Sequence, residues 1–197
     1  MTRLTAVRPL ATPSPIERIP TKLPGTFELR PRKMVDHRGA FIKVFQSSLF
    51  EQDGLESGFV EQYYSVSEAN VLRGMHFQTP PSDHAKLVYC THGTAMDVLL
   101  DLRRGSPTYG QFDIVELSGA KSNAMYVPRG VAHGFYVVQA PVIMLYNVTS
   151  EYDPGHDAGI AWNSFGAPWP STNPVVSDRD ARFPALRDFE SPFRFQG

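Results

Sequence analysis

The sequence predicts an all-β protein whose short antiparallel strands form a closed barrel or a double-sheet jelly roll. Three observations support this fold class: many short segments rich in β-branched and aromatic residues, turn-forming residues between them, and scarce helical periodicity. The 197 residues fit one domain of ordinary size. Because 42% of them are hydrophobic, the chain has enough apolar side chains to fill a core.

The expected elements follow from the N-terminus. Residues 1–24 are expected to form an extended or loosely attached arm, because their prolines disfavour regular structure, and one domain is expected over residues 25–197. The predicted strands are 41–45, 60–66, 71–77, 87–91, 95–102, 112–117, 124–127, 135–138 and 142–148. A short helical turn is expected from Ser48, and Gly93 is interpreted as a turn between strands. Beyond about Ser164, a proline-rich tail is expected to wrap the barrel, with a turn capped by Ser177.

Charge and cysteine content exclude several classes of protein. Nineteen Lys and Arg residues against twenty Asp and Glu residues leave a formal charge of -1, which provides no basic field for a nucleic acid. Cys90 is the single cysteine, so the chain forms no internal disulfide and suits a reducing compartment. No apolar stretch has the length of a signal peptide or a membrane span. We therefore expect a cytoplasmic protein without nucleic-acid or membrane partners.

The segment Val71–Gln78 contains the first candidate for chemistry. Strand alternation places Arg73 and His76 on opposite faces, unless Gly74 marks a bulge. From this segment alone, His76 is either a hydrogen-bonded core histidine or a functional residue.

A Pro-x-Gly-x-x-His motif that ends at His133 is a signature of the cupin superfamily, whose members are β-jelly rolls. In many cupins this motif supplies a metal ligand. The first cupin motif, however, should contain His-x-His and a later Glu, whereas glycine and glutamine lie two residues before and two after His76. The usual metal triad is therefore incomplete, and convergence of His76, His84 and His133 remains the alternative for a metal site.

Several separated motifs occur in an order that resembles the dTDP-4-dehydrorhamnose 3,5-epimerase family. They are Val71–Gln78, Ala85–Cys90, Asp97, Asp101–Arg103, Ser106–Thr108, Val127–Pro128 and Ala132–Phe135. The resemblance extends from about Gly25 to Pro184. It implies a metal-free and cofactor-free cupin jelly roll that epimerises a nucleotide-diphosphate 4-keto-6-deoxyhexose at C3, at C5 or at both.

The resemblance also implies a catalytic set. Removing a proton next to a ketone needs a base, a group that stabilises the resulting oxyanion, and an acid that returns a proton on the other face. By resemblance His76 is the base, Asp180 its carboxylate partner, Lys86 the stabiliser and Tyr146 the acid. On the residues alone, Asp178 is an equal alternative to Asp180. The alternative to a catalytic role is a capping or surface carboxylate for Asp180, an ordinary strand-end lysine for Lys86 and a core tyrosine for Tyr146.

Further positions match substrate-binding residues of the family. Arg38 and Arg73 correspond to arginines that meet the diphosphate, as suits a planar bidentate donor, although either is also compatible with an ordinary surface arginine. His133 and Tyr152 correspond to residues that line the sugar pocket. Phe41 corresponds to a residue near the nucleotide base, and a core role is its alternative.

The sequence departs from the family pattern at three positions of the expected pocket. Lys43 replaces an acidic residue, while Glu61 and Tyr63 replace the two ends of a Gln-x-Asn pair. These changes alter charge, hydrogen bonding and volume, so the nucleotide base or the sugar is expected to differ from the rhamnose pathway. A GDP-linked or CDP-linked sugar and epimerisation at one carbon are both open.

Two other functions remain open: a 3,4-ketoisomerase acting on the same substrate class, and a non-catalytic sugar-binding cupin. The resemblance implies a homodimer in which the N-terminal segment contributes to the partner.

Overall fold

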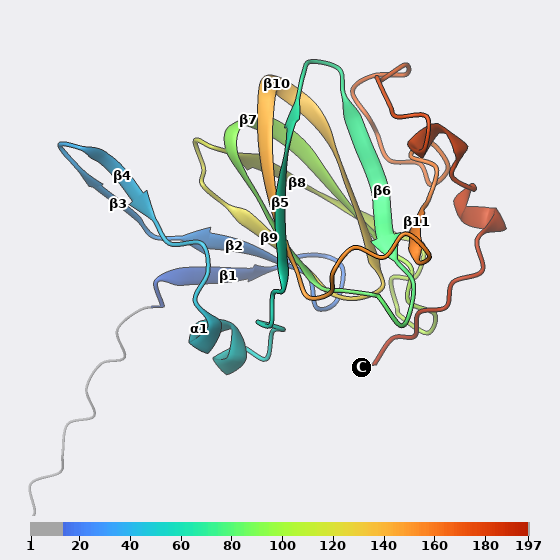
Figure 1. Cartoon of the computed structure of the whole chain (residues 1–197), viewed down its shortest axis with the longest axis horizontal. Helices are drawn as coiled ribbons and strands as arrows, with labels where there is room; N and C mark the ends of the chain where they lie inside the picture. Colours follow the sequence, from blue (N-terminus) through green and yellow to red (C-terminus); the bar gives the residue numbers. More distant parts are fainter. Residues whose placement is uncertain (1–13, 197) are drawn as a thin grey trace, which may run out of the picture.

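The dominant feature of the fold is a nine-stranded antiparallel sheet that folds over into two facing layers (Figure 1). The structure, a computed structural model, describes residues 14–196. Helices in this range are short: α1 (Ser47–Gln52) and the 3-10 turns η1 (Asp180–Arg182) and η2 (Leu186–Asp188). None of the described helices is long and apolar enough to cross a membrane. The predicted all-β jelly roll is therefore confirmed.

The strands are β1 (Ile16–Pro20), β2 (Phe27–Pro31), β3 (Lys33–Asp36), β4 (Gly39–Ile42), β5 (Glu61–Ser67), β6 (Leu72–Gln78), β7 (Lys86–Asp101), β8 (Phe112–Ser118), β9 (Ala124–Val127), β10 (Val131–Val148) and β11 (Asp157–Gly159). The strands of the large sheet run in the order β1-β2-β9-β7-β10-β6-β11, with β5 on β10 and β8 on β7. A separate hairpin contains β3 and β4.

The long strands β7 and β10 belong to both layers. They pair with each other, but the start of β7 pairs with β9 and its end with β8, while the start of β10 pairs with β6 and its end with β5. The β7–β10 register shifts between Val137 and Met144, where the strands pass from one layer to the other. One layer thus contains β5 and β9, and the other contains β6 and β8.

The prediction divided each of these long strands into two, which is wrong. Gly93 does not end a strand, since it lies inside β7 with φ +78°. A Cβ on Gly93 would lie 2.3 Å from the carbonyl oxygen of Pro141 in β10. The glycine therefore allows the two backbones to approach closely at the bend.

The prediction of a loosely attached N-terminal arm is wrong for residues 16–20, while residues 1–13 lie outside the described part. Ile16–Pro20 forms β1, an edge strand that pairs in register with β2, and Ile16 is buried. Proline is tolerated at the end of an edge strand, which explains why Pro20 does not prevent pairing. Strands β2, β3 and β11 were also not predicted, and β4 overlaps the predicted strand 41–45 only in part.

The β3–β4 hairpin projects away from the two layers (Figure 1). The C-terminal tail follows the outside of the layer that contains β6: Val175 bridges to Val71, and the backbone of Phe193 bonds to Arg104. Ser177 Oγ accepts a hydrogen bond from the Asp180 N–H at 3.1 Å, as predicted for a cap. The tail thereby brings η1 against β6.

Candidate active site

A cavity of about 360 Å³ lies between the layers and is lined from β5, β6, β7, β10, β11 and the tail. The predicted residues on its wall are Glu61, Tyr63, Arg73, His76, Lys86, His133, Tyr146 and Tyr152. Asp180 lies behind His76 and lines a smaller adjoining cavity that shares Arg73, His76 and Arg179 with the first. Most residues predicted from the sequence thus meet in one place.

A bulge in β6 allows both Arg73 and His76 to line the cavity. Three residue steps on β6, from Arg73 to His76, match two on β10, from Phe135 to His133, so β6 contains one extra residue. Gly74 lies in this bulge with φ +141°, and a Cβ there would lie 2.5 Å from Gly134 Cα. The predicted role of Gly74 is therefore confirmed.

His76 and Asp180 form a dyad. His76 Nε2 lies 2.9 Å from Asp180 Oδ2, which also accepts the Gly74 N–H at 3.1 Å. Burial opposes ionisation of Asp180, but the hydrogen bonds from His76 and Gly74 outweigh it and hold the pKa of this carboxyl below its usual range. Burial lowers the pKa of His76, against the effect of Asp180. The dyad is thus a neutral imidazole held by a carboxylate, which is an arrangement suited to accept a proton. The alternative carboxylate, Asp178, is exposed.

Arg179 is a neighbour of the dyad that sequence reasoning missed. Its Nη2 lies 2.8 Å from His76 Nε2, its Nε 3.2 Å from Asp180 Oδ1, and its Nη1 2.7 Å from Asp157 Oδ2 in β11. Its only signal in the sequence is its position between the two candidate aspartates, Asp178 and Asp180.

Lys86 places a cation in the same cavity. Its side chain is almost fully buried, and Nζ donates a hydrogen bond to the backbone oxygen of His76 at 3.1 Å. Burial lowers its pKa to about 8. Lys86 is therefore a largely protonated ammonium at neutral pH, beside His76, and an ammonium in this position can stabilise developing negative charge.

Tyr146 enters the cavity from the other layer, on the second half of β10. Its ring stacks on Tyr63, which lies opposite in the β5–β10 register, with centroids 4.8 Å apart and planes at 18°. The Tyr146 ring also makes an edge contact with the His133 ring, with the two centroids 5.9 Å apart. Burial raises the pKa of the Tyr146 phenol well above its usual value. The phenol consequently retains its proton and is available as a donor.

His133 is fixed at the inner wall by Asp97, with Nε2 and Oδ1 2.6 Å apart and both side chains buried. The three histidines of the alternative metal site have different polar partners: Asp180 for His76, Asp97 for His133, and Gln78 and Ser150 for His84. Within residues 14–196, no group of three or more His, Cys, Asp or Glu side chains is arranged to hold a metal ion.

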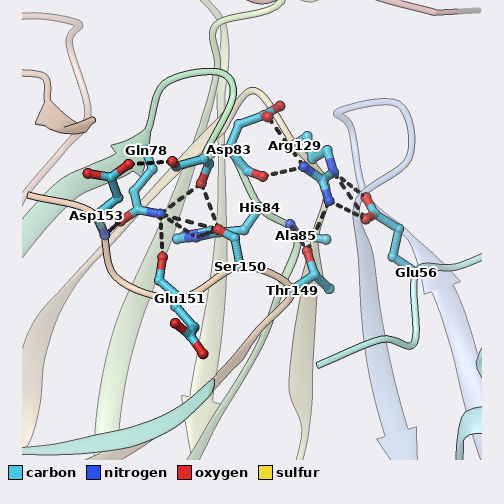
Figure 2. Close-up of polar contacts among 11 residues, drawn as sticks. Glu56, Gln78, Asp83, His84, Ala85, Arg129, Thr149, Ser150, Glu151 and Asp153 are labelled. Carbon is cyan, nitrogen blue, oxygen red and sulfur yellow. Dashed lines mark hydrogen bonds and ion pairs between the residues drawn. The ribbon is translucent and has the colours of Figure 1, made fainter. Parts of the chain in front are cut away.

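A polar network at the rim ties the loops together (Figure 2). Gln78 Nε2 donates to the backbone oxygens of Ser82 and Glu151, and its Oε1 accepts the Asp153 N–H at 2.7 Å. Beside it, Arg129 forms an ion pair with Glu56 at 2.8 Å. The network, which sequence reasoning missed, fixes the loop that leads into Lys86. Gln78, which lies where a His-x-His motif starting at His76 would have its second histidine, thus supports loops.

Arg38, Phe41 and Lys43 lie outside this cavity within one chain. All three are exposed and belong to the β3–β4 hairpin or the residue that follows it, and Arg38 forms an ion pair with Asp36 at 2.6 Å. The expectation that Lys43 shares a pocket with Glu61 and Tyr63 therefore does not hold within a single subunit. Tyr152 is exposed at the mouth, where its N–H bonds to Glu61 Oε2 at 2.6 Å.

Comparisons with known proteins identify the family. Residues 20–188 match the family model of dTDP-4-dehydrorhamnose 3,5-epimerase. The chain is 39% identical over 171 residues to the Sinorhizobium fredii protein of that name. The aligned region covers 85% of this chain and 88% of the relative.

Two solved structures give the same result. A Legionella pneumophila dTDP-6-deoxy-D-glucose-3,5-epimerase in complex with dTDP-4-keto-L-rhamnose superposes with TM-score 0.88 and 32% identity, covering 92% of this chain and 100% of the other. A Bacillus anthracis dTDP-4-dehydrorhamnose 3,5-epimerase with TDP and PPi bound gives TM-score 0.84 and 36% identity, covering 87% and 99%. This chain therefore belongs to the dTDP-4-dehydrorhamnose 3,5-epimerase family.

Proposed function

We propose that this protein is an isomerase that epimerises a nucleotide-diphosphate 4-keto-6-deoxyhexose at C3, at C5 or at both, without a cofactor. The observation that carries the proposal is that a neutral imidazole and a protonated phenol enter one cavity from opposite layers. His76 comes from β6 in one layer and Tyr146 from the part of β10 that pairs with β5 in the other. Inversion of a carbon centre requires a base and an acid on opposite faces of the substrate.

In this proposal His76 removes the proton next to the ketone, and the electron pair moves onto the ketone oxygen as an enolate. The Lys86 ammonium stabilises that oxygen, while Asp180 stabilises the imidazolium. Tyr146 then delivers a proton to the same carbon from the other face. His76 and Tyr146 return to their starting states by exchanging protons with water.

The nucleotide and the sugar are open within this proposal. Relatives act, by their names, on dTDP-linked sugars, but Glu61 and Tyr63 alter the charge and the shape of the cavity wall. A GDP-linked or CDP-linked sugar and inversion at one carbon are therefore included among the outcomes that the test distinguishes. The 3,4-ketoisomerase alternative needs proton transfer along one face, which the placement of His76 and Tyr146 on opposite layers disfavours.

Proton NMR tests the proposal. The protein is incubated in D₂O with 4-keto-6-deoxyhexoses linked to dTDP, UDP, GDP or CDP. Deuterium at C3 or C5, together with the inverted product, is expected for the sugar linked to one of these nucleotides. A thermal-shift measurement with the free nucleotides identifies in advance which nucleotide the protein binds. A ketone moved to C3 would instead identify the ketoisomerase. No exchange with any of the four would contradict the proposal and favour a sugar-binding cupin.

Lys86 is expected to set the alkaline limit of the reaction. Because burial lowers its pKa to about 8, the ammonium loses its proton as the pH rises through this value, and kcat/KM falls. Tyr146 does not explain such a loss, since burial raises its pKa. Lys86→Met is expected to lower kcat/KM at neutral pH by about 10²-fold and to remove the alkaline limb. A limb near pH 8 that persists in Lys86→Met would exclude this assignment.

The proposal includes a homodimer in a cytoplasmic setting. Support for the dimer comes from exposed apolar side chains on the projecting hairpin and on β5: Met34, Val35, Phe41, Tyr64 and Val66. On the hairpin Met34 lies opposite Phe41, and neighbouring exposed apolar groups of this kind favour association. In such a dimer the hairpin would bring Arg38 and Phe41 to the partner's cavity, where the diphosphate and the nucleotide base would lie.

Mixing two inactive variants tests this arrangement. His76→Ala lacks the base and Arg38→Ala lacks the diphosphate contact, so each homodimer is expected to be nearly inactive. After subunit exchange at equal amounts, about a quarter of the sites combine an intact His76 with an intact hairpin and recover turnover. No recovery, despite heterodimers detected by native mass spectrometry, would show that Arg38 serves its own chain.

A further inference from the structure

Arg179 contacts both members of the dyad formed by His76 and Asp180. Asp180 uses Oδ2 for His76 and Oδ1 for Arg179 Nε, while Arg179 Nη2 lies 2.8 Å from the same imidazole nitrogen that meets Asp180. The guanidinium is held by Asp157 and lies over the Phe183 ring at 5.6 Å, and that ring meets the edge of His76 at 5.7 Å. Arg179 is therefore anchored beside the base.

A base of this kind faces an electrostatic conflict. It must be unprotonated before it can accept a proton, but a buried carboxylate 2.9 Å away favours the imidazolium. The Asp180 carboxylate can only accept at Nε2, so that nitrogen carries the proton of the neutral ring. The Arg179 guanidinium therefore acts on His76 through its charge, which repels an imidazolium. At His76 Nε2, Asp180 and Arg179 thus have opposite effects.

We propose that Arg179 is a positioning residue that keeps His76 unprotonated before the substrate is bound, and that Asp157 holds Arg179 in place for this purpose. The inference rests on the proposed function for the assignment of His76 as the base. Arg179 neutralises part of the Asp180 charge and leaves Asp180 able to orient the ring. It acts through His76 and not on the substrate.

The surroundings of His76 support this role. The charged or titratable groups that line the two cavities with His76 come from every neighbouring element. They are Asp180 and Arg179 from the tail, Asp157 from β11, His84 from the loop before β7, Lys86 from β7, His133 and Tyr146 from β10, Tyr152 from the loop after β10, Glu61 and Tyr63 from β5, and Arg73 from β6 itself. Burial lowers the pKa of His76 most, Asp180 raises it, and Arg179 and Lys86 lower it. Without Arg179, only burial and Lys86 would oppose the effect of Asp180 on the pKa of His76.

The test is an NMR titration of the free protein. The His76 ring signal is assigned by its loss in His76→Asn. Arg179→Gln keeps a hydrogen-bonding amide but removes the charge, and is expected to raise the His76 titration midpoint by about one pH unit. Arg179→Lys retains the charge and is expected to stay near the wild-type midpoint. The matched control is Arg182→Gln, which removes an exposed charge from the same turn and is expected to leave the midpoint unchanged.

Kinetics supply the second readout. In Arg179→Gln the acid limb of kcat/KM for deuterium exchange is expected to move upward by the same amount, because more of the base is protonated at a given pH. An unmoved midpoint in folded Arg179→Gln, or an equal shift in Arg182→Gln, would overturn the inference. Since the titration needs no substrate, a shifted midpoint without turnover of any 4-keto sugar would reject only the proposed function.

Discussion

His76→Ala is expected to abolish deuterium exchange at both C3 and C5, with a loss of about 10³-fold to 10⁴-fold in turnover. The reason is that a single base serves each carbon in turn, so its removal leaves no group to form either enolate. The fold should survive, because the contact of Lys86 is with the backbone oxygen of His76, which alanine retains. Proton NMR in D₂O measures exchange at the two carbons separately.

His92→Ala is the matched control for this variant. His92 lies in β7 with an exposed side chain, and its replacement is expected to leave exchange at the wild-type rate. Exchange at one carbon that survives in His76→Ala would demonstrate a second base and contradict the single-base assignment.

Tyr146→Phe is expected to separate exchange from inversion. The variant retains the ring that stacks on Tyr63 and loses only the hydroxyl, so the cavity keeps its shape. His76 still forms the enolate, and deuterium still enters from the base side. Delivery from the opposite face, and with it the inverted product, is expected to fall by about 10²-fold or more.

Tyr109→Phe, the matched control, removes the hydroxyl of an exposed tyrosine between β7 and β8, away from the cavity, and is expected to alter neither rate. The measured quantity is the ratio of exchange to inverted product. Inversion at the wild-type rate in Tyr146→Phe would assign the acid to another residue.

The sequence predicted strands that are rich in apolar, β-branched or aromatic residues and missed those defined by long-range pairing. Residues 112–117 and 124–127 were placed within one residue of β8 and β9. The continuity of β7 and β10 was not predictable, because Gly93 has the same local signature whether it ends a strand or permits a close approach to Pro141. Similarly, β1 depends on pairing with β2, which proline-rich local composition does not reveal.

The residues of the site also fall into two groups, those that the sequence identifies and those that depend on tertiary contacts. His76, Lys86 and Tyr146 could be named because family motifs surround them, and the structure brings them to one cavity. Arg179 and Asp157 could not, because they meet the dyad only after the tail has folded back onto β6 and β11. Arg38 also shows the limit of the family pattern: a motif identifies a residue type at a position and does not say which subunit uses it.

The continuous backbones of β7 and β10 also have a consequence for how the reaction is aligned. β10 contributes His133 before its bend and Tyr146 after it, so a single covalent segment reaches both walls of the cavity. The separation of the two walls is consequently set by main-chain curvature and needs no domain closure. Inserting or deleting one residue at the bend would change that separation, and turnover should therefore tolerate many side-chain changes there but not a change in length.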